Sequence, residues 1–386
     1  MMLTLIITLS MFLTACWDKT EINDRAFVLA LGIDHIPPSE QPKEDREHKA
    51  LEKVLGEHAP HYRMTYAFPK QMLAGGEPTV ENIIMSSVGE NIYINERQMK
   101  ARVDNQLFLG HLKSVVLGEE VVKTPQMFRE VLDALEKDPL ISRKVNLAIA
   151  VGEAKEVLNV EPKQESISGQ FITDLFMGED RTNRAPVADL DQLFISLHDN
   201  SNAAIPRLTG AEEELKLGGA AIIKNYEFVG WIGELESMGL MILKNETDIF
   251  VVTINADGIN IPYQVTEIKT VYTIQQKDKE IKMLIEIEAE GDIVQYFFDP
   301  EEDVLDPALL EKLEQEVEKK LQGIVMHTVE KLQKDLETDV LGFDTYIKRH
   351  NPDLWAQVGK DWVEIFPTVE VEVVVDAKIR RVGLTK

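Results

Sequence analysis

Cys16 is the residue with the clearest chemical signature, because it is the only cysteine among the 386 residues of the chain. It follows Leu13-Thr14-Ala15 at the end of residues 1–15, an uncharged and mostly apolar stretch. This is the pattern of a bacterial lipobox, in which small residues precede a thiol that accepts a diacylglycerol group once it is activated as a nucleophile. We therefore predict that residues 1–15 are a signal peptide, cleaved between Ala15 and Cys16. Cys16 is then predicted to carry an S-diacylglycerol and an N-acyl chain.

An alternative for the same stretch is an ordinary apolar leader that happens to end in a buried cysteine. The stretch is too short to cross a bilayer as a stable helix, which needs roughly 20 apolar residues. No Lys or Arg precedes it, and the consecutive Met1 and Met2 leave the start codon open. Two or more acyl chains hold a protein stably on a membrane, at about 0.8 kcal/mol for each buried CH₂. We therefore expect the membrane surface to be a partner through lipid, with the rest of the chain outside the cytoplasm.

Residues able to do metal or acid–base chemistry form no complete set. His58 and His61 have the spacing of metal ligands but lack a nearby third ligand, and His111 and His327 fall in a predicted strand and helix. The chain has no phosphate-binding loop, no nucleophile elbow and no H-E-x-x-H motif. We therefore predict no catalytic residues, no metal site and no cofactor, and we expect a protein that is not an enzyme.

The charge of the chain limits its partners. The formal net charge is −26, whereas nucleic-acid binding needs Lys and Arg to displace counterions from phosphates. We therefore expect no nucleic-acid partner and no broad attraction to anionic lipid headgroups. With one cysteine, no disulfide forms within the chain, so stability must come from apolar burial.

The strands and helices predicted from the sequence pattern indicate a multi-domain α+β protein. We expect residues 16–160 to form a mixed α/β domain with a polar loop at 35–60, residues 161–207 to form a connector, and residues 208–386 to form an α+β domain. In the first domain and the connector, the pattern predicts strands at 28–34, 61–68 (ending before Pro69), 106–117 and 146–151, and helices at 79–99, 125–137, 153–158 and 190–197.

The C-terminal half is predicted to be an antiparallel sheet packed by a long helix. Its strands are expected at 220–224 and 227–231 (a hairpin), 248–254, 259–275, 281–289 and 369–379. The helix is expected at about 307–338, capped by Asp306, with an apolar stripe that covers the sheet. A coiled coil is the alternative for this helix. Glu318 lies beside the polar edge of the stripe, so we expect Glu318→Ala to change little.

Four blocks of residues resemble one known family. They are Cys16-Trp17-Asp18-Lys19-Thr20-Glu21-Ile22-Asn23-Asp24 followed by Val28–Asp34, Gly218-Gly219-Ala220-Ala221 with Gly230-Trp231, Gly342–Ile347 with Asn351-Pro352 and Trp355, and Val369–Val375 with Lys378–Gly383. In this order they resemble the spore germination receptor C-subunit family, written Ger(x)C. The uncharged leader and the polar stretch 35–60 depart from its pattern.

The resemblance implies a function and a location. It implies a lipoprotein on the outer face of the spore inner membrane or cell membrane, without known catalytic activity. It also implies two multi-pass membrane partners, the A-type and B-type subunits of a nutrient germinant receptor. Cys16 alone transfers as a functional residue, and the ligand-binding residues stay unknown. The alternative is a solute-binding envelope lipoprotein that delivers a small nutrient to a transporter, which would show two similar α/β lobes around a cleft. An envelope hydrolase is disfavoured by the missing motifs.

Overall fold

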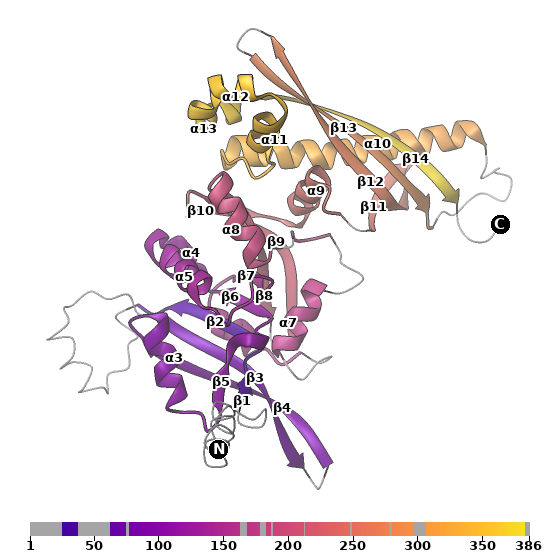
Figure 1. Ribbon diagram of the computed structural model, residues 1–386. Helices are drawn as coiled ribbons and strands as arrows, with labels where there is room; N and C mark the ends of the chain where they lie inside the picture. Colours follow the sequence, from indigo (N-terminus) through magenta and orange to yellow (C-terminus); the bar gives the residue numbers. More distant parts are fainter. Residues whose placement is uncertain are drawn as a thin grey trace, which may run out of the picture.

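The computed structural model describes most of the chain after its first 24 residues. The described residues are 25–37, 62–74, 77–162, 168–177, 183–186, 188–211, 213–247, 249–277, 280–295 and 306–382. The predicted signal peptide and most of the predicted polar loop lie outside these ranges. Two sheets follow one another along an elongated body (Figure 1).

The first sheet has eight strands within the described ranges, in the order β10-β9-β8-β7-β6-β2-β3-β4. The strands are β2 (Ala30–His35), β3 (Tyr62–Ala74), β4 (Glu77–Gly89), β6 (Ser114–Leu117), β7 (Asn146–Ala150), β8 (Asn202–Ala211), β9 (Glu214–Lys224) and β10 (Glu227–Ile232). The four strands β2, β6, β7 and β8 are parallel, and the outer strands on both sides are antiparallel. A separate parallel pair, β1 (Arg25–Phe27) and β5 (Gln106–Phe108), lies at the end where the described chain begins.

Helices cover both faces of the parallel strands, as expected for strands that are apolar on both sides. They are α3 (Ile92–Lys100), α4 (Glu119–Lys123), α5 (Pro125–Lys137), α6 (Ala154–Leu158), α7 (Ser168–Met177) and α8 (Leu190–Asp199), with a short 3₁₀ turn at Leu109–His111. Residues of α5 and α8 share one core with β2, β6 and β7, and residues of α6 and α7 form a second core on the other face. Figure 1 shows α5 and α7 on opposite sides of the sheet.

The second sheet has the order β11-β12-β13-β14. Its strands are β11 (Phe250–Ala256), β12 (Ile259–Lys277), β13 (Glu280–Ile293) and β14 (Glu370–Val382). The first three pair antiparallel, whereas β14 pairs in parallel with β13 because the chain crosses back through helices before it re-enters the sheet. The multi-domain α+β class with a long helix on a C-terminal sheet is therefore confirmed, with a parallel last strand as an added feature.

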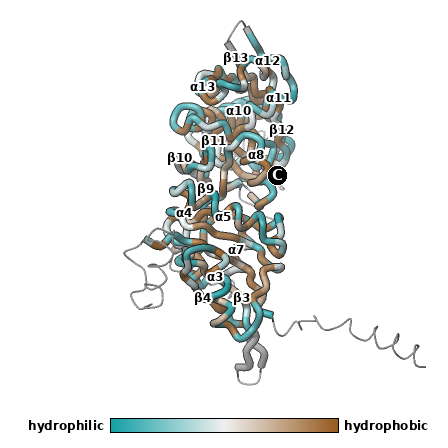
Figure 2. The backbone as a smooth tube through the Cα atoms, turned by 60° about the vertical axis from the view of Figure 1, so that its left-hand side comes forward, coloured by the Kyte–Doolittle hydropathy of each residue, from teal (hydrophilic) through white to brown (hydrophobic). Residues whose placement is uncertain are grey.

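The helices of this half lie on one face of the second sheet. They are α9 (Glu234–Lys244), α10 (Pro307–Glu330) with a π-helical turn at Lys331–Asp335, α11 (Phe343–His350), α12 (Pro352–Val358) and α13 (Trp362–Ile365), with 3₁₀ turns at Gly359–Asp361 and Phe366–Thr368. Asp306 caps α10 as predicted, because its carboxylate accepts a hydrogen bond from the Ala308 amide at 3.0 Å. The stripe on α10 faces the sheet, so the helix is not part of a coiled coil. Hydrophobic residues follow the middle of the body through both halves (Figure 2).

Three predictions about the first half are corrected. Residues 79–99 are not one helix, because β4 pairs with β3 along its whole length and α3 begins only at Ile92. Strand β3 continues through Pro69, because β2 pairs with β3 only as far as Ala67 and leaves the side facing Pro69 without a partner. Residues 161–207 are more than a connector, since they contain α7, α8 and the first six of the ten residues of β8.

The boundary expected at residue 208 falls within a strand of the first sheet. Strands β8, β9 and β10, which cross or follow it, join the first sheet rather than the second. The hairpin of β9 and β10 turns at Asn225 and Tyr226, which have φ angles of 53° and 68°. Two positive φ angles define the two-residue turn that suits twisted antiparallel strands, so the predicted hairpin is confirmed.

Candidate functional site

The predicted lipid-attachment site lies outside the described residues. Ala15 and Cys16 both precede Arg25, the first described residue, and His58 and His61 fall in another undescribed range. Acylation of Cys16 therefore stays a prediction. Arg25 is the first described residue after Cys16 in the sequence.

The surface around Arg25 contains a cluster of aromatic rings. Because β1 pairs with β5, Arg25 lies beside Gln106, and its guanidinium group is 4.4 Å from the ring centre of Phe108. Phe27 contacts Phe108 edge-on at 5.7 Å between ring centres and His111 at 5.0 Å. Arg25, Phe27, Phe108 and His111 are called the aromatic cluster below. His111 therefore has aromatic neighbours rather than metal ligands around it.

His327, the other histidine considered from the sequence, lies exposed on α10. Its Nε2 atom is 3.1 Å from a carboxylate oxygen of Glu236 on α9. Within the described ranges, no group of three or more His, Cys, Asp and Glu side chains is placed to hold a metal ion. No described helix is both long enough and apolar enough to cross a membrane.

Asp34 is a buried carboxyl group that the motif search missed. It is the next-to-last residue of the apolar strand β2, and only 1% of it is exposed. One carboxylate oxygen accepts a hydrogen bond from the Ala154 amide at 2.6 Å and the other from the Lys155 amide at 2.9 Å. Burial raises the pKa of Asp34 to about 6, although these two amides act in the opposite direction. Asp34 therefore caps the N-terminus of α6 and ties that helix to β2.

Asp339 plays a similar part in the second half. Its two oxygens accept hydrogen bonds from the amides of Gly342 (3.0 Å), Phe343 (3.2 Å) and Asp344 (2.9 Å). The indole nitrogen of Trp362 donates a fourth at 2.9 Å. Burial, together with the neighbouring Asp344 carboxylate, raises the pKa of Asp339. The sequence block at 342–347 is therefore explained by capping of α11 and by its attachment to α13.

The block at 218–221 is explained by close packing of two strands. Gly219 has a φ angle of +80°, and a Cβ atom there would lie 2.5 Å from the carbonyl oxygen of Ile232. Arg207 donates from Nε to the Gly218 carbonyl at 2.8 Å, and its guanidinium group lies 5.8 Å from the ring centre of Trp231. The glycines thus let the arginine pass between the strand and the tryptophan.

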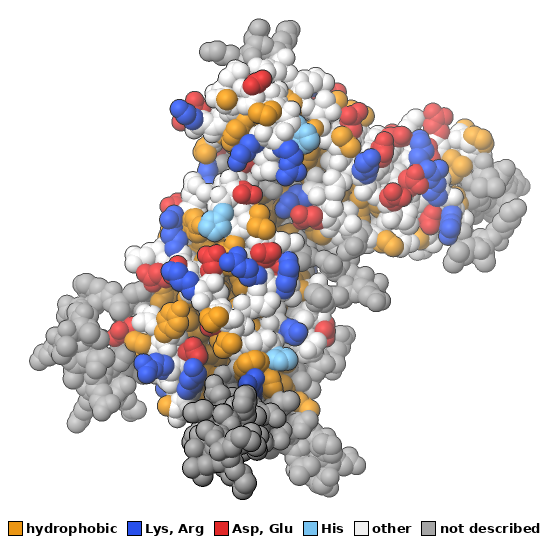
Figure 3. All heavy atoms as spheres, in the orientation of Figure 1, with side chains coloured by type: hydrophobic (Ala, Val, Ile, Leu, Met, Phe, Trp, Pro, Cys, Tyr) orange, Lys and Arg blue, Asp and Glu red, His pale blue; other side chains and the backbone are white. Residues whose placement is uncertain are grey.

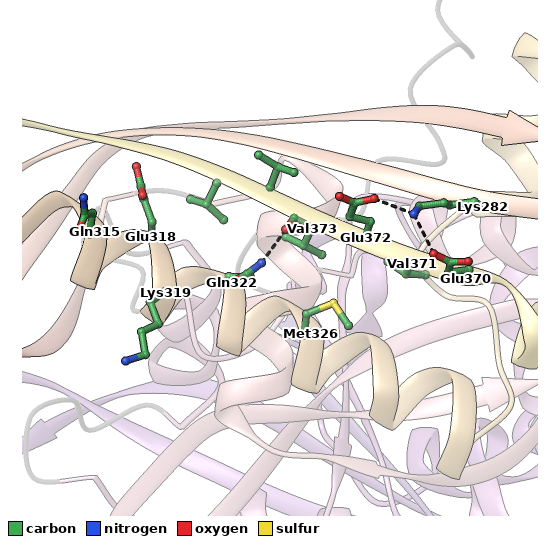
Figure 4. A pocket seen from close by; sticks show the side chains of 12 residues that line it. Lys282, Gln315, Glu318, Lys319, Gln322, Met326, Glu370, Val371, Glu372 and Val373 are labelled. Atoms are coloured by element: carbon green, nitrogen blue, oxygen red, sulfur yellow. Dashed lines mark hydrogen bonds and ion pairs between the residues drawn. The ribbon is translucent and has the colours of Figure 1, made fainter.

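A groove of about 830 Å³ lies between α10 and the edge strand β14 (Figure 4). Gln322 donates to the Val373 carbonyl at 2.8 Å across it. Further along α10, Glu318 accepts from the Ala377 amide at 3.2 Å and Glu314 from the Ile379 amide at 3.0 Å. These three side chains are four residues apart on one face of the helix. They form hydrogen bonds with backbone groups of β14 that an edge strand would otherwise expose to solvent.

The mouth of this groove carries charge but no catalytic arrangement. Figure 4 shows Lys282 between Glu370 and Glu372, at 2.8 and 2.7 Å. Both carboxylates are paired to one ammonium group. The groove therefore offers an ion-paired rim and hydrogen-bonded strand edges, which suit a structural role.

Comparison with known families covers almost the whole chain. A family described as "Spore germination protein N-terminal domain" matches residues 18–210, and one described as "Spore germination B3/ GerAC like, C-terminal" matches residues 218–383. The first match begins two residues after Cys16.

Individual relatives and one solved structure agree with this. The spore germination protein YndF of Bacillus subtilis (strain 168) is 27% identical over 100% of this chain and 97% of its own length. The spore germination protein KC of the same organism is 24% identical over 96% of this chain and 93% of its own length. The crystal structure of the GerBC protein shares the fold, with a TM-score of 0.59 and 20% identity over 84% of this chain and 95% of that one.

Proposed function

The chain belongs to the spore germination receptor C-subunit family, and we propose that it is the lipid-anchored, non-catalytic C subunit of a nutrient germinant receptor. The observation that carries the proposal is the position of the family match. The N-terminal family domain begins at residue 18, two residues after the only cysteine and the lipobox pattern that precedes it. A role in spore germination follows from the family itself.

The proposed location is the outer face of the spore inner membrane, with Cys16 as the point of attachment. The proposed partners are the membrane surface and two multi-pass receptor subunits of the A and B types. A net charge of −26 supports the absence of nucleic acid from this set.

A non-catalytic role is supported by the hydrogen bonds of the buried carboxyl groups. General acids and bases have at least one oxygen directed at a substrate. Both oxygens of Asp34 and both oxygens of Asp339 instead accept hydrogen bonds from backbone amides. Their raised pKa values therefore accompany helix capping.

The alternative, a solute-binding lipoprotein, gains no support from the architecture. That class requires two similar lobes around a cleft. Here the two sheets differ in strand number, in strand order and in the placement of their helices. A receptor subunit is therefore the better proposal.

The test is to replace Cys16 by alanine in the spore-forming host. Cys16→Ala is expected to abolish lipid labelling, to release the protein from the membrane fraction and to abolish the response to nutrients. Ala15→Gly, which keeps a small residue at the cleavage site, is the matched control and is expected to behave like the parent. Lipid labelling or salt-resistant membrane retention of Cys16→Ala contradicts the proposed anchor.

A further inference from the structure

The end of the described structure that contains Arg25, the described residue nearest to Cys16 in the sequence, carries a group of basic side chains, although the chain as a whole is strongly acidic. This end is formed by β1, β5, the last turn of α3, the part of β3 around Lys70 and the segments next to these elements. Among its described residues are six cationic side chains: Arg25, Lys70, Arg97, Lys100, Arg102 and Lys113. We call these six residues the basic end.

Two carboxylates at this end are paired to its lysines, and a third, Glu81 on β4, lies opposite Lys70 in the strand register. Glu96 lies 2.6 Å from the ammonium group of Lys100, and Asp104 lies 3.9 Å from that of Lys70. The other cations are therefore in excess. The acidic balance of the protein is carried by the rest of the chain.

Strand pairing and local contacts bring the basic end together. The register of β1 and β5 places Arg25 beside Gln106, next to the segment that follows α3. Arg102, in that segment, donates to the Ser86 carbonyl at 3.1 Å. Figure 1 places α3, β1 and β5 at the end labelled N, and Figure 3 shows Lys, Arg, His and hydrophobic side chains, with Asp or Glu side chains among them, on the described surface next to that end.

The aromatic cluster lies in the middle of this surface. Phe27 and Phe108 are half-buried, and His111 is exposed beside them. Phe side chains next to Lys and Arg side chains also occur on surfaces that lie at a membrane interface.

The chain length between the anchor and this surface limits their separation. Residues 17–24 join Cys16 to Arg25. Nine steps of fully extended chain span at most about 30 Å. If Cys16 is in the bilayer, the basic end is therefore held close to the headgroups.

We propose that the basic end and its aromatic cluster rest on an anionic phospholipid surface, with the acidic remainder of the molecule directed away from it. This inference rests on the proposed anchor at Cys16. Anionic headgroups attract Lys and Arg within a Debye length of the surface and repel carboxylates. The charge separation along the molecule thus gives it one orientation on the membrane.

The test attaches a spin label to an introduced cysteine. Because Cys16 is the only natural cysteine and its thiol is acylated, the introduced cysteine is the only reactive thiol. A nitroxide is attached to Gln106→Cys at the basic end or to Gln357→Cys on α12, which lies at the opposite end in Figure 1. The acylated protein is placed on vesicles of phosphatidylcholine with or without phosphatidylglycerol. On the anionic vesicles, the label at 106 is expected to lose several-fold of its accessibility to a water-soluble relaxation reagent. The label at 357 is expected to stay accessible.

Charge variants separate electrostatic attraction from simple proximity. Lys100→Glu with Lys113→Glu is expected to restore the accessibility of the label at 106, as is high salt. Lys319→Glu with Lys320→Glu on α10 makes the same change of charge elsewhere and is expected to leave the protection intact.

Three outcomes overturn the proposal. One is a label at 106 that stays as accessible as the label at 357 on anionic vesicles. The second is equal protection of the label at 106 on vesicles with and without phosphatidylglycerol. The third is protection of this label only when membrane receptor subunits are present, because the basic end then rests on a protein and not on lipid. Failure of the anchor is recognised separately, because the thiol of Cys16 in the parent would then react with a maleimide.

Discussion

At the scale of single residues, Asp34 ties the stability of the protein to pH. Burial raises its pKa from 3.8 to about 6, so the folded protein keeps a proton that the unfolded chain has released between these values. The contribution of this group to the free energy of unfolding is therefore complete below about pH 4 and is lost as the pH rises through about 6. A shift of this size corresponds to at most about 3 kcal/mol.

We predict that Asp34→Asn removes this part of the pH dependence. Urea unfolding of the parent between pH roughly 4 and 7 is expected to show a decline in stability that the variant lacks. Glu156→Gln, an exposed position on α6, is the control and is expected to follow the parent. Equal slopes for the parent and Asp34→Asn contradict the prediction.

Gly219 supplies a second prediction at this scale. Its φ angle of +80° and the 2.5 Å approach of a Cβ atom to the Ile232 carbonyl make any side chain unfavourable. Gly219→Ala is expected to lower the free energy of unfolding by at least about 1–3 kcal/mol. Gly323→Ala on α10, where a Cβ atom meets nothing within 4 Å, is expected to raise it by about 0.5–1 kcal/mol. Equal effects in chemical denaturation argue against the strain at Gly219.

The sequence predicted a functional residue that is recognised from its neighbours in the chain. It missed the residues whose roles depend on hydrogen-bond partners that only the fold brings to them. Cys16 is recognisable from the residues directly before it. Asp34 and Asp339 are two among 67 acidic residues, and their role depends on amides brought to them by the fold. The one available signal was an acidic residue at the end of an apolar strand.

At the scale of elements, the contact between α10 and β14 changes the expectation for Glu318. Glu318 accepts a hydrogen bond from the amide of Ala377, a residue that is only 1% exposed. Removal of the acceptor leaves that amide without its partner at the edge of the sheet. A position that the sequence pattern placed on a solvated edge therefore stabilises the strand.

We now predict that Glu318→Ala lowers the free energy of unfolding by about 1–2 kcal/mol. Glu311→Ala, an exposed carboxylate earlier on α10, is the charge-matched control and is expected to change it by less than about 0.5 kcal/mol. Thermal unfolding of both variants measures this difference. A Glu318→Ala variant that is as stable as the control contradicts the prediction and agrees with the expectation from the sequence that this substitution changes little.

Elements set by local signals were predicted well. Helix α5 has its predicted limits at Pro125 and Lys137, and the turn at Asn225 forms as expected. The failures lie where the presence or the end of pairing with a neighbouring strand decides the structure. Residues 79–89 are a strand because β3 is beside them, and β3 can include Pro69 because its pairing with β2 ends at Ala67.

At the scale of the whole molecule, strand β9 links the two halves. Its side chains alternate between two cores, with Ile222 packed in the core of the second sheet and Ile223 in that of the first. Hydrogen bonds also join the halves, since Lys224 donates to the Glu337 carbonyl at 2.7 Å and Asn202 to the Asp339 carbonyl at 3.2 Å. The sequence pattern alone suggested a break near residue 208, because alternation within a strand does not reveal that each face has a different partner.

This shared strand predicts that the folded part unfolds as one unit, without help from a disulfide or a metal. Ile222 and Ile223 are both fully buried, so Ile222→Ala and Ile223→Ala are each expected to cost about 2–5 kcal/mol. Since each substitution weakens one core and both cores contain β9, calorimetry is expected to show a single transition that both variants shift downward. Val374→Ala, at a position that is 48% exposed on the outer face of the second sheet, serves as the control and is expected to leave the midpoint almost unchanged. Two separate transitions, of which Ile222→Ala shifts one and Ile223→Ala shifts the other, contradict this coupling. Each core would then unfold independently of the core on the opposite face of β9.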